Sequence, residues 1–319
     1  MDGRIENEIK INNNINRLLK DLPDYVSSLY YNMQVSKSPR TCYEYILSIK
    51  RFLNYINVDI QQVDDNVIGR YLQSIKYTDD NKKHSESCIK FAYTVLKLLF
   101  KYLYDKKIID NNPMQLIQRP KKKDDVERYY LEMSELTKIL NSALDYNNKW
   151  KERDYAILFL LMVTGMRRTA LSEININNID FSNRNIRVVD KRDKLQIYDI
   201  TDEMRDAITN WLVVRKNILI DIGKENDALF INSNGDRISD KMVYRIVQKY
   251  SYKSIGKKIS PHKIRASFAS LFYEKSGHDI EATRIAVGHQ DISTTSIYIT
   301  KNNKIRSYAA NFFSENLTK

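Results

Sequence analysis

The sequence predicts a mainly α-helical (α+β) protein, with a helical N-terminal domain and a mostly helical second domain that contains a small antiparallel β-sheet. Three observations lead to this prediction. The 319 residues exceed the usual length of one domain. Glycine and proline are scarce, at 8 and 5 residues, which disfavours the many tight turns of an all-β fold. Apolar residues recur at helical spacing along most of the chain.

Helical patterns run through the first 120 residues. Apolar residues predict a helical lead-in segment over residues 1–35, which Pro23 interrupts. Ser38-Pro39-Arg40-Thr41 has the capping serine and first-turn proline of a helix start. The apolar stripes that follow predict a compact helical domain over 36–118. An exposed, charged linker is expected over 119–128.

The second domain is expected over residues 129–304, followed by an amphipathic tail helix over 305–319. Alternating apolar residues predict two strands, 185–189 and 195–200, on either side of a basic turn. Helices are expected over residues 132–144, 155–163, 203–220, 240–249, 262–275 and 279–287.

The charge of the chain favours a polyanionic partner. The formal net charge is +12 and the isoelectric point is about 9.3, and basic side chains near phosphates release condensed counterions. A merely soluble basic protein would also carry such a charge. The two cysteines, Cys42 and Cys88, form no metal-binding motif, and no apolar run is long enough for a membrane span. We therefore expect a cytoplasmic protein without metal, cofactor or membrane partner.

Four segments of the second domain carry reactive side chains. Cleaving a phosphodiester without a metal requires guanidinium groups for the phosphate oxygens, a nucleophile such as a tyrosine hydroxyl, and a lysine or histidine as general acid. Each element alone is common in proteins, but the ordered set is specific. In chain order the segments are Thr164-Gly165-Met166-Arg167, the hairpin with Lys191, His262-Lys263-Ile264-Arg265, and Gly288-His289 followed by Tyr298.

This ordered set resembles the tyrosine recombinase (phage integrase) family, in its simpler Xer-like or Cre-like form. The stretch from Val287 to Tyr298 resembles the family's nucleophile motif almost position for position, and the similarity covers about residues 20–305. The resemblance implies a site-specific recombinase of the kind found in mobile elements or in dimer resolution. It implies these catalytic residues: Arg167, Lys191, His262, Arg265, His289 and Tyr298.

The resemblance also implies how DNA is held. The first domain would be a core-binding domain (SAM-like), and the two domains would form a C-shaped clamp around a specific recombination site. Four such chains would assemble as a homotetramer on two sites, with the tail docking on a neighbour and accessory factors as further candidate partners. The residues that we expect to contact DNA are Arg40, Thr41, Lys90, Lys121, Lys122 and Lys123.

Several positions depart from the family pattern. Ala170 stands where an acidic residue is usual, with Glu173 one turn further on, and Asp190 replaces the usual glycine before the hairpin lysine. Lys194 is therefore an alternative to Lys191, and Arg168 adjoins Arg167. Two other functions remain open: relaxation of DNA as in a type IB topoisomerase, and DNA binding by a catalytically inactive relative.

Overall fold

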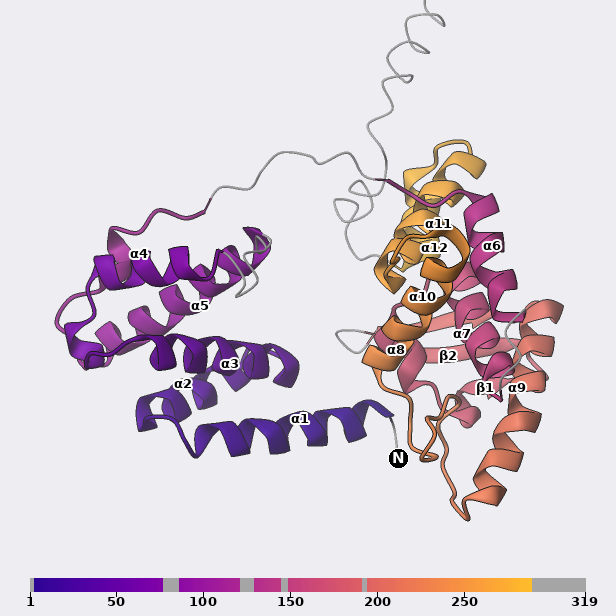
Figure 1. Cartoon of the computed structure of the whole chain (residues 1–319), viewed down its shortest axis with the longest axis horizontal. Coiled ribbons are helices and arrows are strands. Elements are labelled where there is room, and N and C mark those ends of the chain that lie inside the picture. Colours follow the sequence, from indigo (N-terminus) through magenta and orange to yellow (C-terminus); the bar gives the residue numbers. More distant parts are fainter. Residues whose placement is uncertain (1–2, 77–85, 121–128, 145–148, 191–193, 289–319) are drawn as a thin grey trace, which may run out of the picture. The chain divides into compact units, whose positions relative to one another are not determined.

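The computed structural model describes residues 3–76, 86–120, 129–144, 149–190 and 194–288. The chain divides into two compact units, one containing Arg4–Val126 and the other Glu127–Lys319 (Figure 1). Each unit has its own apolar core. Helices dominate both units and the second holds a small antiparallel sheet, which confirms the predicted fold class. No described helix is both long enough and apolar enough to cross a membrane.

The N-terminal unit is a set of helices around one core. Its helix starts are fixed locally: Ser38 accepts the N–H of Thr41 at 3.4 Å, and Asp64 accepts that of Val67 at 2.8 Å. Ile15 and Val26, from the segment expected as a lead-in, are fully buried in this core. The helices are α1 (Gly3–Leu19), α2 (Asp24–Gln34), α3 (Pro39–Tyr55), α4 (Asp65–Ser74) and α5 (Glu86–Asp105), with short 3-10 turns η1 (Ile60–Gln62) and η2 (Pro113–Gln115).

The second unit is arranged around α7 (Lys151–Thr164), which packs against α6, α9 and α11. Because neighbours cover it on several sides, α7 is apolar nearly all round, as Ile157, Leu158 and Leu160 illustrate by being fully buried. The other helices are α6 (Met133–Leu144), α8 (Arg168–Glu173), α9 (Asp202–Asp221), α10 (Asp240–Ile255), α11 (Pro261–Lys275) and α12 (Ile280–Val287), with the 3-10 turn η3 (Ile176–Asn178).

The sheet has the order β1-β2-β3 and is antiparallel throughout. β1 is Ile179–Asp180, β2 is Asn185–Asp190 and β3 is Lys194–Asp199. The register pairs Asn185 with Asp199 at one end and Asp190 with Lys194 at the other. The predicted hairpin is therefore confirmed, while residues 191–193, which connect its strands, are not among those described.

Several elements differ from the sequence-based expectation, among them α7, which begins at Lys151 and not at the expected Tyr155. β1 and α8 were not predicted, because two and six residues are too few for a periodic pattern. Helix α10 continues to Ile255, six residues beyond the expected end at 249. Its last turns include Ser251, which is buried and accepts the N–H of Ile259 at 3.0 Å. The buried face of α10 thus continues through a polar residue. A prediction based on the spacing of apolar residues does not detect such a residue.

A buried ion pair within α7 is hydrogen-bonded to Tyr250 of α10. Asp154 is 2% exposed and accepts the N–H groups of Arg153 at 2.8 and 3.0 Å. Its second oxygen accepts the hydroxyl of Tyr250 at 3.0 Å. Arg153 also donates to the carbonyl of Ile231 at 3.1 Å and lies over the ring of Trp150. Every charge in this network has a partner, which is the condition for keeping ions inside a core.

Asp154→Ala is expected to lower the free energy of unfolding of the second unit by about 3–5 kcal/mol, since it leaves the Arg153 charge buried without its carboxylate. Urea denaturation followed by tryptophan fluorescence measures this, because both tryptophans, Trp150 and Trp211, lie in this unit. Glu152→Ala is the matched control: its ion pair with Lys151 is only partly buried and 3.8 Å long, so we expect a change within about 0.5 kcal/mol. Equal effects of the two substitutions would contradict the assigned role of Asp154.

Candidate active site

Arg265 connects separate segments of the chain at the candidate site. Helix α11 begins with Ser260, whose hydroxyl accepts the N–H of Lys263 at 3.2 Å, and with Pro261 in its first turn. This start places His262, which is exposed, one turn before Arg265, which is 3% exposed. The guanidinium of Arg265 donates from Nη1 to the carbonyl of Gly165 at 2.7 Å and from Nη2 to that of Val287 at 2.6 Å. One side chain thus joins the ends of α7 and α12.

Two glycines permit close approaches at the same place. Gly165 ends α7 with φ 59°, and a Cβ there would lie 2.6 Å from Cδ1 of Phe268 on α11. Gly288 ends α12 with φ 67°, and a Cβ there would lie 2.6 Å from the side-chain oxygen of Gln196 on β3. Both positions need a left-handed backbone without a side chain. Strand β3 of the hairpin therefore lies beside the end of α12, which Arg265 joins to the end of α7.

The two adjacent arginines, Arg167 and Arg168, have different surroundings. Arg167 is half-buried at the N-cap of α8, with an extended backbone. Arg168 pairs with Asp240 of α10 at 3.3 Å and lies over the ring of Tyr244. The side chain of Arg168 is thus held against α10. Ala170, at the usual acidic position, is 3% exposed in the apolar core, and Glu173 is half-buried at the end of the helix.

The segment that enters this unit is fastened to α11. The N–H of Leu131 donates to the buried hydroxyl of Ser267 at 2.8 Å. The Tyr129 hydroxyl donates to Glu135 and accepts from Lys257 at 3.0 Å. Burial and the hydrogen bond to Glu135 raise the pKa of Tyr129. Burial alone would raise the pKa of Glu135, but the hydrogen bond from Tyr129 lowers it. The start of the second unit thereby holds the helix that carries His262 and Arg265.

The remaining expected site residues divide into two groups. Lys191, His289, Tyr298 and Lys121–Lys123 lie outside the residues that the structure describes. In the N-terminal unit, Arg40 is exposed and pairs with Glu44 at 3.0 Å. Thr41 shares a 3.0 Å hydroxyl contact with Ser38, and Lys90 is half-buried on α5. Within the described segments, no three His, Cys, Asp or Glu side chains are grouped so that they could hold a metal ion.

Gly165→Ala is expected to destabilise the second unit by about 1–3 kcal/mol, because it adds both backbone strain and a clash with Phe268. Urea denaturation monitored by tryptophan fluorescence measures the change. Gly256→Ala is the matched control, since Gly256 ends α10 with φ 67° and has no atom within 4 Å of its added Cβ. The difference between the two variants isolates the close approach to Phe268. A loss no larger than that of the control would contradict it.

Comparisons with known proteins give a family match and several relatives. Residues 129–304 match the phage integrase family. The tyrosine recombinase XerC of Thermodesulfovibrio yellowstonii is 29% identical over 280 residues, covering 86% of this chain and 90% of the relative. The tyrosine recombinase XerD of Staphylococcus epidermidis is 29% identical over 283 residues, covering 78% of this chain and 92% of the relative.

Solved structures share the fold. A lambda integrase (75–356) dimer bound to a core site superposes with a TM-score of 0.66 at 17% identity, covering 88% of this chain and 96% of that one. XerH recombinase bound to its difH substrate gives a TM-score of 0.64 at 23% identity, covering 86% and 79%. The fold is thus that of site-specific recombinases. Because the family match spans more than half of the 319 residues, the chain belongs to the phage integrase family of tyrosine recombinases.

Proposed function

We propose that this chain is a site-specific tyrosine recombinase, which cuts and rejoins duplex DNA with Tyr298 as its nucleophile. The observation that carries the proposal is the contact of Arg265 with the carbonyls of Gly165 and Val287. Gly165 lies two residues before Arg167, and Val287 two residues before His289. The contact supports the proposal because Gly165 and Val287, which Arg265 holds, are each close in sequence to a proposed catalytic residue.

The reaction is a pair of transesterifications. The Tyr298 hydroxyl attacks the scissile phosphorus, a bond from phosphorus to the tyrosine oxygen forms, and the bond to the 5′ oxygen breaks. Lys191 gives the leaving oxygen its proton, while His262 and His289 assist proton transfer and position the phosphate. The product is a 3′-phosphotyrosyl link and a free 5′ hydroxyl. Attack by the 5′ hydroxyl of a second duplex reverses the step and yields a Holliday junction, so no ATP is needed.

Arg167 and Arg265 stabilise the charge on the phosphate oxygens. A guanidinium suits this role because its planar N–H groups match a pair of oxygens. Arg265 is 3% exposed, and its two carbonyl contacts fix the plane of the group before any DNA arrives. A donor whose orientation is fixed in advance, in a site with little water, stabilises developing charge more than a mobile donor at the surface.

DNA is held by both units and exchanged in an assembly of four chains. The surplus of 12 positive charges supplies the general attraction. Arg40, Thr41, Lys90 and Lys121–Lys123 contact the sugar-phosphate backbone as residues 36–118 and 129–304 clamp the duplex. Arg40 can exchange Glu44 for a phosphate at little cost, because both side chains of that pair are exposed, by 55% and 42%. The 305–319 tail docks on a neighbouring chain in a homotetramer on two sites.

Covalent trapping tests the proposal. The protein is incubated with nicked duplexes taken from DNA that flanks its gene, and SDS-resistant adducts are isolated. We expect an adduct at one DNA sequence, and we expect it to form in the presence of EDTA as well. Mass spectrometry is expected to find the phosphate on the peptide that contains Tyr298. Recombinant products between two such sites are expected as well. Sequence-independent relaxation without recombinants would instead support a topoisomerase, and tight binding without any adduct an inactive relative.

A further inference from the structure

A short segment of chain holds both ends of α8. The Nη1 atom of Arg237 lies 3.3 Å from the carbonyl oxygens of Ser172 and Ile174, and its Nη2 donates to the side chain of Asn175. These acceptors lie at or just after the end of the helix. Three residues further along the chain, Asp240 pairs with Arg168 at the start of the same helix, at 3.3 Å.

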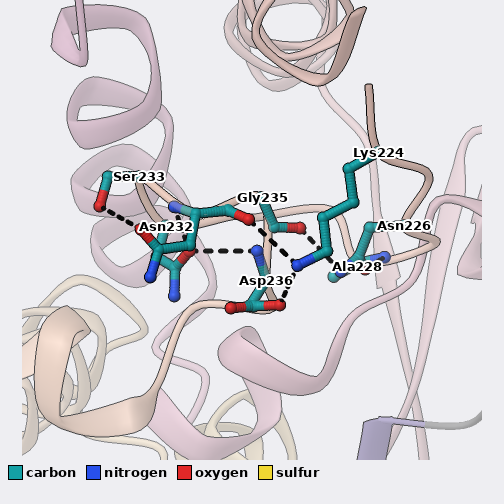
Figure 2. Close-up of polar contacts among 8 residues, drawn as sticks. Lys224, Asn226, Ala228, Asn232, Ser233, Gly235 and Asp236 are labelled. Carbon is teal, nitrogen blue, oxygen red and sulfur yellow. Dashed lines mark hydrogen bonds and ion pairs between the residues drawn. The ribbon is translucent and has the colours of Figure 1, made fainter. Parts of the chain in front are cut away.

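The loop before this segment is fastened by its own side chains. Asn232 accepts the N–H groups of Asn234 and Asp236, at 2.8 and 3.1 Å, and Figure 2 shows Asn232 beside Asp236. Lys224 reaches from beyond the end of α9, donates to the carbonyl of Asn234 at 3.1 Å and pairs with Asp236. Asn226 donates to the carbonyl of Gly235 at 2.9 Å. With its turn closed in this way, the loop delivers Arg237 in one fixed place.

The base of the loop is anchored in the core of the second unit. On α9, Trp211 donates to the carbonyl of Leu229 at 2.8 Å and Arg215 to that of Ala228 at 2.9 Å. The N–H of Leu229 in turn donates to the carbonyl of Ile174 at 2.8 Å. The loop is therefore linked directly from α9 to the residues that follow α8.

Helix α8 depends on such support. It has six residues, too few for a helix to be stable by its own hydrogen bonds. Its backbone carbonyls at the C-terminal end have no partners within the helix, and Arg237 supplies one. Arg167 is the N-cap of α8, and its carbonyl accepts the N–H of Leu171 at 3.0 Å. The position of α8 therefore determines the position of the Arg167 backbone, from which its side chain extends.

We infer that residues 237–240 form a two-ended clamp on α8 that positions Arg167 for the scissile phosphate, with Arg237 as the main positioning residue. This inference rests on the proposed recombinase function. Arg237 touches no substrate in this scheme and acts through the helix. The clamp gives a role to Arg237 and Asp240, which take no part in the proposed reaction.

Arg237→Ala is expected to slow adduct formation on the nicked site by about 10–100-fold, because a displacement near 1 Å of a catalytic group costs that much. The dissociation constant for the site is expected to stay within about twofold, since α8 is one of many contributors to binding. The same rates are measured on a duplex with a neutral methylphosphonate at the scissile position. That substrate lacks the charge that Arg167 stabilises, so the loss caused by Arg237→Ala is expected to shrink there.

Arg205→Ala is the matched control, because the ion pairs of Arg205 with Asp202 and Asp206 are exposed. This variant is expected to form the adduct at wild-type rates. Asp240→Asn loosens the other end of the clamp, and a smaller loss of the same kind is expected. An equal loss on both substrates would mean that Arg237 serves only the fold and would overturn the inference. A wild-type rate in the folded Arg237→Ala protein would overturn it too.

Amide hydrogen exchange without DNA tests the clamp separately from the proposed function. Exchange at Leu171 and Ile174 is expected to be at least about tenfold faster in Arg237→Ala, through local opening of α8, while amides of α7 keep their wild-type rates. Unchanged exchange at these two amides would overturn the clamp even if the chain is a recombinase. If wild type forms no adduct on any DNA, the proposed function fails and the role assigned to Arg237 toward Arg167 fails with it.

Discussion

The Tyr298→Phe variant is expected to form no SDS-resistant adduct on a site that wild type cleaves, while it binds that site with the same affinity. Phenylalanine keeps the ring and removes the one oxygen that attacks phosphorus, so no covalent link can form. Removing a nucleophile of this kind lowers turnover by about 10⁴-fold or more. Gel electrophoresis in SDS measures the adduct, and a mobility shift without SDS measures binding.

Tyr252→Phe is the matched control, because Tyr252 is an exposed tyrosine of α10 with no role in the proposed reaction, and this variant is expected to keep the adduct at the wild-type level. The comparison matters because the chain has 22 tyrosines, and position in the motif is the only ground for choosing one of them. An adduct formed by Tyr298→Phe, or lost in Tyr252→Phe, would assign the nucleophile elsewhere.

Features that depend on neighbouring residues were predictable from the sequence. Ser38 before Pro39 and Ser260 before Pro261 start α3 and α11 in the structure as the capping rules indicate. The alternating residues at 185–189 and 195–200 pair as β2 and β3. Each of these signals is contained within about ten residues, where side-chain spacing and backbone preference decide the outcome.

Features that depend on distant residues were not predictable. The His-x-x-Arg motif indicated Arg265 as a phosphate ligand, but nothing in it indicates that Arg265 bonds to Gly165, 100 residues earlier. Arg237 was not singled out, because its acceptors are backbone carbonyls about 65 residues away, and carbonyls leave no mark in a sequence. The Asn232-Ser233-Asn234-Gly235-Asp236 run indicates a turn, but its role depends on what that turn supports.

The same limit applied to Arg167 and Arg168. Spacing from Thr164 and Gly165 favoured Arg167, and no local pattern indicated that Arg168 pairs with Asp240 of α10. A motif fixes which residue types are present, whereas a tertiary partner such as Asp240 is set by the fold.

Arg265→Lys is expected to slow adduct formation by about 10²–10³-fold, the loss typical of removing one donor that stabilises transition-state charge. Lysine keeps the positive charge, so a slower rate would reflect the lost geometry of the guanidinium group. Its single ammonium cannot reproduce a planar fork whose two ends lie 2.7 and 2.6 Å from the carbonyls of Gly165 and Val287. At least one of these carbonyls would lose its partner, at a cost of about 1–3 kcal/mol in stability. Single-turnover cleavage and urea denaturation measure the two effects.

Arg284→Lys is the matched control, since Arg284 is an arginine of the same unit that pairs with Glu281 on its own helix, α12. Its cleavage rate and stability are expected to match those of wild type. If Arg265 only tied α7 to α12, the activity of Arg265→Lys would recover in conditions that restore its stability, such as lower temperature. Because the same guanidinium is proposed to hold both the fold and the phosphate, we expect the slow cleavage to persist when the protein is fully folded. Full recovery on cooling would therefore reduce Arg265 to a structural residue and leave Arg167 as the main phosphate ligand.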